Sequence, residues 1–315
     1  MKLQNIVLIP ALILATAGYS FAQTNIFPTK PWNATIKVVG EDRLPISGAN
    51  VVVGYFLPPY AFSDDPKYSD RITGMTDTNG TFFATHNDRT AEIGFSVNKE
   101  EYYETRSVRT LRDPGDSADD RDISITLTLK KVGKPTAMYA KRIRKNPPIL
   151  NQPVGYDLMV GDWVGPYGKG VNTDMIFQAD DYRKSGTDYK HNITISFPKK
   201  GDGIQIYTIP DSEKGSGLRS PHEAPLDSYQ PELNKERSAH PGQPARNDDD
   251  PNQIYLFRVR TRIDDGGNIV SAHYGKIYGD FMQFTYYLNP TPNDRNIEFD
   301  PKQNLLSGEP KVTVP

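Results

Sequence analysis

The sequence predicts an all-β protein, and three observations lead to that prediction. Apolar and polar residues alternate with a period of two in several stretches between residues 34 and 130, which is typical of strands with one buried face. No stretch of that region has sustained helical spacing. Proline (26 residues) and glycine (25 residues) are also frequent, and they favour turns between short strands over long helices.

The first 22 residues have the pattern of a secretory signal peptide (1–22). Lys2 provides a positive start, an apolar stretch follows, and Ser20 and Ala22 are small residues at the −3 and −1 positions of a cleavage site. The mature chain would begin at Gln23. The apolar stretch is shorter than the roughly 20 residues that span a bilayer, so we expect no transmembrane segment in the mature chain. We expect a secreted, periplasmic or cell-surface location in a bacterium.

Four alternating stretches are the strongest strand candidates of a first domain at 33–131. Their expected inward residues are Ile36 and Val38; Ala49, Val51, Val53 and Tyr55; Ile93, Phe95 and Val97; and Ile123, Ile125, Leu127 and Leu129. Residues 50–53 are apolar on both faces apart from Asn50, which favours a central strand. We expect a sandwich of about seven strands.

Two turn motifs belong to this domain. Gly48 precedes the second alternating stretch and tolerates the positive φ of a sharp turn. The segment Asp77–Gly80 is a predicted hairpin turn, because Asn79-Gly80 suits left-handed conformations and Asp77 can accept hydrogen bonds from the turn amides. We expect Phe82 or Phe83 to enter the core after this turn.

These motifs resemble those of the carboxypeptidase regulatory-like domain, an Ig-like or transthyretin-like β-sandwich. The residues that carry the resemblance are Pro45–Val51, Thr76–Phe82 and the closing strand 123–129, and it covers about residues 33–131. The insertion Leu57–Asp70 departs from the family pattern. In that family the domain is non-catalytic, so the resemblance implies an accessory sandwich without peptidase activity.

The remaining chain is interpreted as a basic linker (132–152) and a second β-rich domain of unknown function (153–315). A nucleic-acid patch is the alternative for 132–152, and we disfavour it because no aromatic stacking platform accompanies the charges. The polar segment 210–253 is expected to be a long loop, either functional or loosely ordered. The expected strands are Thr173–Gln178, His191–Phe197, Gly203–Ile209, Ile254–Ile263 and Ile269–Tyr287.

The stretch 254–278 predicts a hairpin whose register can be stated. A turn at Asp265-Gly266-Gly267 would place Phe257 opposite Gly275, where the ring can lie over the glycine. On the other face, Arg258 would lie opposite Tyr274 as a cation–π pair.

Composition and motifs exclude several kinds of chemistry. The chain has no cysteine, which excludes disulfides, thiolate nucleophiles, cysteine-type zinc sites and lipid attachment at an N-terminal cysteine. None of the five histidines lies in an H-E-x-x-H or H-x-x-E frame, and neither a G-x-S-x-G motif nor a phosphate-binding glycine loop is present. Ser196-Phe197-Pro198-Lys199 matches S-x-x-K, but Ser196 ends a predicted strand. We therefore assign no catalytic residue.

An acidic cluster next to the closing strand is a candidate calcium site, formed by Asp116, Asp119, Asp120 and Asp122. Several carboxylates from one loop are what Ca²⁺ requires, and extracellular calcium can occupy weak sites. The alternative, which we favour, is a solvated loop, since the spacing does not match an EF-hand. No other cofactor is expected.

A glycine-rich segment at 161–170 is the candidate ligand-binding loop. Trp163 and Tyr167 could stack on sugar rings while Asp162 and Lys169 bind hydroxyl groups. We favour the alternative, in which Trp163 anchors the loop to the core, because tryptophan is buried in most proteins.

These observations favour a non-catalytic binding or scaffolding protein of the bacterial envelope. A carbohydrate-binding accessory protein is the alternative, and a hydrolase with an unfamiliar site is the third candidate. The expected partner is a carbohydrate or another envelope protein. Nucleic acid is not expected, because 37 basic and 39 acidic residues give a net charge of −2.

Overall fold

The computed structural model confirms the all-β prediction, with 56% of the described residues in strands and 1% in helix. The described residues are 31–56, 69–87, 90, 92–110, 121–144, 146–306, 308, 312 and 314. The predicted signal peptide and residues 57–68 of the insertion lie outside them. Among the described residues, no helix is long and apolar enough to cross a bilayer.

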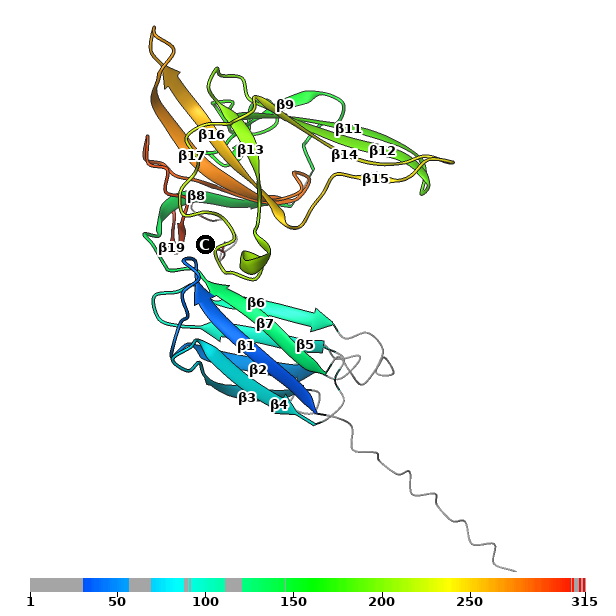
Figure 1. Cartoon of the computed structure of the whole chain (residues 1–315). Coiled ribbons are helices and arrows are strands. Elements are labelled where there is room, and N and C mark those ends of the chain that lie inside the picture. Colours follow the sequence, from blue (N-terminus) through cyan, green and yellow to red (C-terminus); the bar gives the residue numbers. More distant parts are fainter. Residues whose placement is uncertain are drawn as a thin grey trace, which may run out of the picture.

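The first unit, β1–β7, consists of two sheets (Figure 1). The three-stranded sheet has the order β4-β1-β7 and consists of β1 (Trp32–Gly40), β4 (Thr81–His86) and β7 (Asp122–Leu129). The four-stranded sheet has the order β3-β2-β5-β6 and consists of β2 (Asn50–Phe56), β3 (Ser69–Met75), β5 (Glu92–Asn98) and β6 (Thr105–Thr110). Strand β2 therefore lies between two neighbours, as its apolar faces predict.

The core of the first unit consists of the residues that alternation predicts to point inward. Ile36, Val51 and Val97 are completely buried, and Phe95 is 2% exposed. One clustered apolar core joins the two sheets. Burial of this face is the main stabilising contribution that the alternating pattern encodes.

The two predicted turns adopt the expected backbone. Gly48 has φ of 66° and Gly80 has φ of 71°. The Asp77 carboxylate accepts hydrogen bonds from the amides of Asn79 (2.9 Å) and Thr81 (2.7 Å). Phe82 then packs against the core, whereas the side chain of Phe83 is exposed.

The second unit, β8–β19, is a sandwich of two six-stranded sheets. One sheet has the order β10-β9-β11-β12-β14-β15 and consists of β9 (Pro153–Asp157), β10 (Asp162–Trp163), β11 (Met175–Ser185), β12 (Asp188–Ser196), β14 (Glu232–Ala239) and β15 (Arg246–Asn247). The other, called the second sheet from here on, has the order β13-β16-β17-β18-β8-β19 and consists of β13 (Gly203–Thr208), β16 (Gln253–Ile263), β17 (Ile269–Gly279), β18 (Phe284–Leu288), β8 (Thr136–Ile143) and β19 (Phe299–Asn304). Tyr156, Phe177, Phe257 and Tyr286 belong to the aromatic-rich core between the sheets.

The expected basic linker at 132–152 contains a strand of the second unit, so the linker interpretation was wrong for this part. Strand β8 pairs with β18 on one side and with β19 on the other. Met138 and Ala140 are completely buried. Charged residues lie near both ends of β8, so the segment has the composition of a linker. The apolar alternation that buries the strand is short and lies between those charges.

The expected long loop at 210–253 is also corrected. It contains the 3₁₀ turn η1 (Asp211–Glu213) and the strands β14 and β15. Strand β14 carries charged residues on both faces, so its sequence lacks the alternation that marks a strand. Ala224 and Tyr229 of this segment pack on the outer face of the second sheet, so the segment partly covers a face that would otherwise meet water.

The hairpin register is confirmed, with one exception among the side chains. Phe257 lies opposite Gly275, and a Cβ at Gly275 would come within 2.3 Å of the Phe257 ring. Arg258 lies opposite Tyr274, but its guanidinium lies over Tyr229, 4.7 Å from the ring centroid. The predicted single strand 269–287 is two strands, β17 and β18, with a turn at 280–283.

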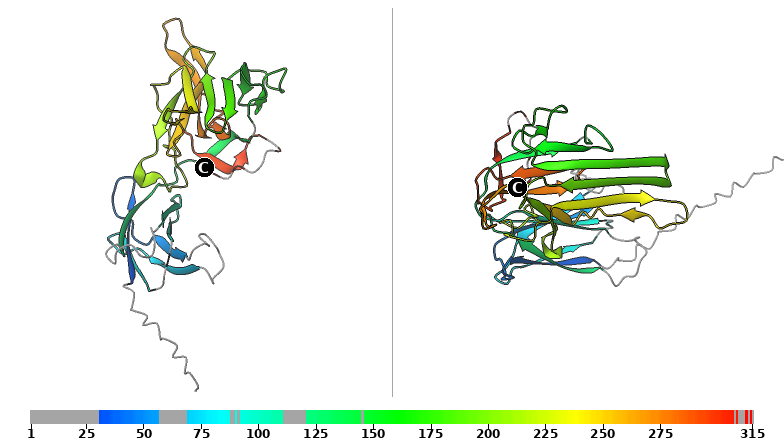
Figure 2. Two further views of the ribbon diagram at one scale, coloured as in Figure 1. Left: turned by 90° about the vertical axis from the view of Figure 1, so that its right-hand side faces the viewer. Right: turned by 90° about the horizontal axis from the view of Figure 1, so that it is seen from above.

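A hydrogen-bonded seam joins the two units. Strand β6 of the first unit is extended at its edge by the segment 215–217: the Arg106 amide donates to the Gly215 carbonyl, and the Gly217 amide donates to Glu104 (both 2.8 Å). The buried Lys130 ammonium contacts Glu213 at 2.7 Å. Both figures place η1 at this junction (Figures 1 and 2).

Candidate functional site

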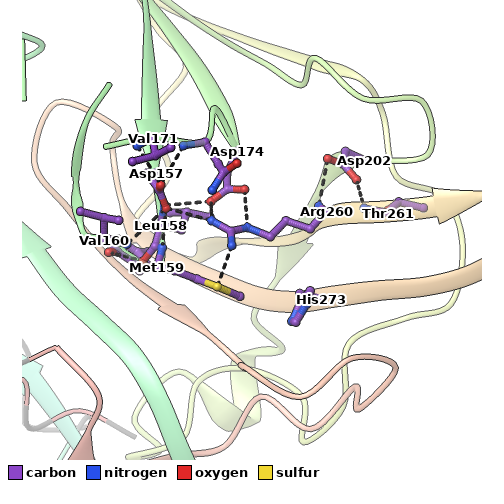
Figure 3. A network of polar contacts seen from close by, with 12 residues as sticks. Asp157, Leu158, Met159, Val160, Val171, Asp174, Asp202, Arg260, Thr261 and His273 are labelled. Carbon is purple, nitrogen blue, oxygen red and sulfur yellow. Dashed lines mark hydrogen bonds and ion pairs between the residues drawn. The ribbon is translucent and has the colours of Figure 1, made fainter. Parts of the chain in front are cut away.

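An arginine clamp anchors the loop that the sequence singled out. Arg260 of β16 makes a two-point contact with Asp174 (2.8 and 2.9 Å) and reaches Asp157 at 2.8 Å (Figure 3). Both carboxylates are almost completely buried. Because Asp157 and Asp174 lie at the two ends of the loop, the clamp holds both ends against the second sheet.

The protonation of this clamp follows from its contacts. Burial raises the pKa of Asp157, but hydrogen bonds from the amides of Asn172, Val171 and Val160, together with Arg260, outweigh it and leave the pKa lowered. Burial lowers the pKa of Arg260, but its contacts with Asp174 and Asp157 outweigh that effect and leave the pKa raised. The clamp is therefore charged on both sides, and its charges are satisfied within the protein.

The predicted ligand residues lie on the clamped loop but point to different surroundings. Trp163 is half-buried, with its ring edge-on to Tyr156 (4.9 Å between centroids) and Phe177 (5.4 Å). The Asp162 carboxylate accepts hydrogen bonds from the amides of Trp163 (2.9 Å) and Lys169 (2.8 Å). Tyr167 is 41% exposed. The contacts of Trp163 are those expected of a core anchor, and sugar binding by this loop stays a prediction.

Only one residue of the predicted calcium cluster can be placed. Asp122 begins β7, is exposed, and accepts a hydrogen bond from the Asn33 side chain at 2.7 Å. Asp116, Asp119 and Asp120 lie outside the described residues. Elsewhere in the part of the chain that the structure describes, no three acidic or histidine side chains are grouped so as to hold a metal ion.

The second unit has two neighbouring hollows that the sequence did not predict. The first hollow has a volume of about 280 Å³ and includes Asp180, His191 and Asn192 in its lining. The second hollow has a volume of about 740 Å³ and lies at one end of the outer face of the second sheet. They share a wall formed by Arg237, Asp249, Asp280 and Gln283.

The shared wall is rigid because Arg237 is paired on both sides. Its guanidinium contacts the carboxylate of Asp249 and that of Asp280, the latter at 2.8 Å. These residues come from β14, from the segment before β16, and from the β17–β18 turn. The amides of Met282 and Gln283 also donate to Asp280, which fixes that turn.

The first hollow is lined by both charged and amide side chains. Asp181 forms an ion pair with His191, and Lys235 is buried, with its ammonium bonded to the Asp248 carbonyl. Such a surface can donate and accept hydrogen bonds, which suits a ligand with several hydroxyl groups.

The second hollow combines tyrosines with cationic side chains. Arg219 lies over the Tyr278 ring at 4.8 Å, and burial raises the pKa of Tyr278 to about 12. Behind the rings, the completely buried Lys276 donates to the Ser220 hydroxyl at 3.0 Å. Burial, and then the charges of Lys130 and Arg219, lower the pKa of Lys276 well below its usual value.

The acidic run 248–250 was one local signal for these hollows. It was visible in the sequence as a cluster without a role. Its contact with Arg237 follows from the pairing of β14 with β15, and the further contact of Arg237 with Asp280 follows from the packing of the two sheets. No spacing rule connects residues that meet in this way.

Comparisons with known proteins do not place the chain in a family. No protein-family model matches it, and no curated protein sequence matches it. The resemblance to the carboxypeptidase regulatory-like domain therefore stays a prediction.

Solved structures show weak similarity. The 3-chlorocatechol 1,2-dioxygenase of Rhodococcus opacus 1CP is 15% identical, over 32% of this chain and 60% of the enzyme, with a TM-score of 0.25. The catechol 1,2-dioxygenase of Acinetobacter sp. ADP1 is 11% identical, over 34% of this chain and 55% of the enzyme, also with a TM-score of 0.25. The match thus spans little more than half the length of these enzymes.

The shaft pilin spaA of Lactobacillus rhamnosus GG is 14% identical, over 78% of this chain and 93% of the pilin, with a TM-score of 0.24. At these scores the function has to be argued from this chain's own residues.

Proposed function

We propose that this chain is a non-catalytic binding and scaffolding protein of the bacterial envelope, and that its signal peptide is cleaved after Ala22 on export. The observation that carries the proposal is the seam between the units. A protein that presents a surface at a fixed position needs its domains held together, and domains joined only by a mobile linker do not meet that need.

The seam supports this role through its backbone and its buried charges. Gly215 is required there, because a Cβ would lie 1.7 Å from the Arg106 carbonyl oxygen. His222 contacts Glu298 of the second unit and Glu41 of the first, the latter at 3.3 Å. These contacts connect both sandwiches through the same segment.

Four measurements on the full-length chain test the proposal. Exported protein should begin at Gln23 by intact mass, and a membrane-impermeant reagent should label it on intact or outer-membrane-permeabilised cells. The two units should unfold in one transition that Gly215→Val splits into two, while Gly186→Val, at an exposed turn where a Cβ would meet nothing, leaves it single. Turnover of chromogenic ester, phosphate or glycoside substrates would contradict a non-catalytic role.

Carbohydrate binding is the second candidate, supported by the two hollows and their mixture of carboxylates, amides and tyrosines. A glycan array with the full-length chain tests it directly. Gln283→Ala, in the shared wall, should weaken retention of any glycan that binds, and Gln303→Ala, outside both hollows, should not. Retention of no glycan leaves scaffolding as the function.

A further inference from the structure

We propose that the second hollow binds an acidic sugar, with Arg142 and Arg219 holding its carboxylate group; this inference rests on the carbohydrate-binding candidate function. Arg142 extends from β8, and Arg219 extends from the segment that covers the sheet. A planar guanidinium can donate two parallel hydrogen bonds to a carboxylate, which makes arginine the preferred side chain for that group.

The first argument is the absence of an internal counter-charge. Among the residues that the structure describes, neither Arg142 nor Arg219 has a carboxylate partner, whereas Arg237 in the wall of the same hollow has two. Arg219 is half-buried over Tyr278, so its position is constrained by packing. A positioned guanidinium without a partner is ready to bind an anion from solution.

The second argument is the placement of both arginines around one ring. Arg142 lies opposite Thr285 in the sheet, and Ala140 lies opposite Tyr287, so Arg142 is adjacent to Tyr287 on the same face. Arg142, Arg219 and Tyr287 all line the second hollow, and the charges of the two arginines oppose the rise that burial causes in the pKa of Tyr287. The two arginines therefore face a common space.

The third argument is the uneven charge along the hollow. The end at Arg142 and Arg219 is positive. The opposite end carries Asp249, Asp250 and the amide of Gln253. A ligand with one carboxylate and several hydroxyl groups fits both ends, since aspartate and glutamine bind hydroxyl groups well. A nucleic-acid strand would bring phosphates to the acidic end.

Titration calorimetry on the full-length chain tests the assignment with three probes: a galacturonate oligomer, the neutral galactose oligomer of equal length, and a sulfated galactose oligomer. We expect the galacturonate oligomer to bind, and Arg142→Gln and Arg219→Gln each to weaken it about tenfold, as loss of a charge-assisted hydrogen bond predicts. Arg183→Gln, at an exposed arginine of β11 outside the hollow, should leave the affinity unchanged.

Each other outcome has a definite meaning. Binding of the neutral oligomer in preference to the galacturonate overturns the acidic-sugar assignment and keeps the carbohydrate function. Preference for the sulfated oligomer overturns the proposal that the arginines recognise a carboxylate group. If both arginine variants still bind galacturonate with unchanged affinity and unchanged thermal midpoints, the second hollow is not the binding site, and the proposal is overturned. Failure of all three probes, together with an empty glycan array, removes the carbohydrate function as well.

Discussion

Arg260 and the pair Arg142–Arg219 lie in the same sandwich and differ in what surrounds their charges. Arg260 contacts two almost fully buried aspartates and holds a loop in place. Arg142 and Arg219 border a hollow, with no carboxylate partner among the described residues. The difference separates an arginine whose charge stabilises the fold from arginines whose charge is available to a ligand. Removing Arg260 should therefore lower the stability of the fold strongly, whereas removing Arg142 or Arg219 should leave stability nearly unchanged and weaken ligand binding.

The largest expected effect is the loss of the clamp. Arg260→Ala leaves Asp157 and Asp174 buried without their cation, which should lower the free energy of unfolding by about 3–5 kcal/mol. Denaturant unfolding of the full-length variant measures it. A loss below about 1 kcal/mol, the range of surface ion pairs, would mean that the clamp contributes no more than a surface pair does.

The loop held by the clamp should show the next effect. Trp163→Ala removes a half-buried ring from contact with Tyr156 and Phe177, and we expect a loss of about 3 kcal/mol. Tyr167→Ala, at an exposed position of the same loop, should change stability by less than about 0.5 kcal/mol. If Trp163→Ala instead kept full stability and abolished glycan retention, this loop would be the sugar site.

A third prediction concerns Lys276, the buried lysine behind the second hollow. Its pKa is lowered in the folded state, so between that lowered value and about 10.4 the unfolded chain binds more protons. Stability should therefore rise with pH in this window, by up to about 1.4 kcal/mol per pH unit from this group. Unfolding free energies at pH 7, 8 and 9 measure the slope. Lys276→Met should have a smaller slope, and equal slopes would contradict the buried-lysine assignment.

The upper limit of that window is set by tyrosines. The pKa of Tyr55 and that of Tyr103 are raised to about 12, in both cases mainly by burial. The unfolded chain therefore loses these protons first above about pH 10, and stability falls there. Measurements for Lys276 should stay below pH 9.5.

The smallest expected effect is at the unpaired arginines. Arg142→Gln should change the free energy of unfolding by less than about 0.5 kcal/mol, the usual range for a surface substitution. Thermal and denaturant unfolding of Arg142→Gln, measured together with Arg260→Ala, test this difference in stability. A loss as large as that of Arg260→Ala would show that Arg142 serves the fold, and its availability to a ligand would be ruled out.

The two units also differ in how far local pattern predicts them. In the first unit, alternation places Ile36, Val51 and Phe95 in the core, and Asn79-Gly80 defines the hairpin turn. In the second unit, the register of Phe257 on Gly275 follows from one turn and one alternating strand. These features are short-range, so the information for them lies within a few neighbouring residues.

Burial of charged side chains caused the main errors. Strand β14 buries Lys235 in the middle of a charged stretch, and β8 carries Lys141 and Arg142 close to Met138 and Ala140. Both resemble solvated loop by composition. The long stems of lysine and arginine can be buried while the charged ends find partners, and composition does not register those partners.

The sequence by itself determined the all-β class, the inward faces of the clearest strands, the turns at Gly48 and Gly80, and the hairpin at 254–278. Alternation and turn chemistry act between near neighbours, so they can be read locally. Only the tertiary structure decided that β8 joins the second sheet, that 215–217 extends the first unit, and that Arg142 and Arg219 line the same hollow. Those contacts join segments far apart in the chain, and they depend on how two sheets and their covering segment pack together.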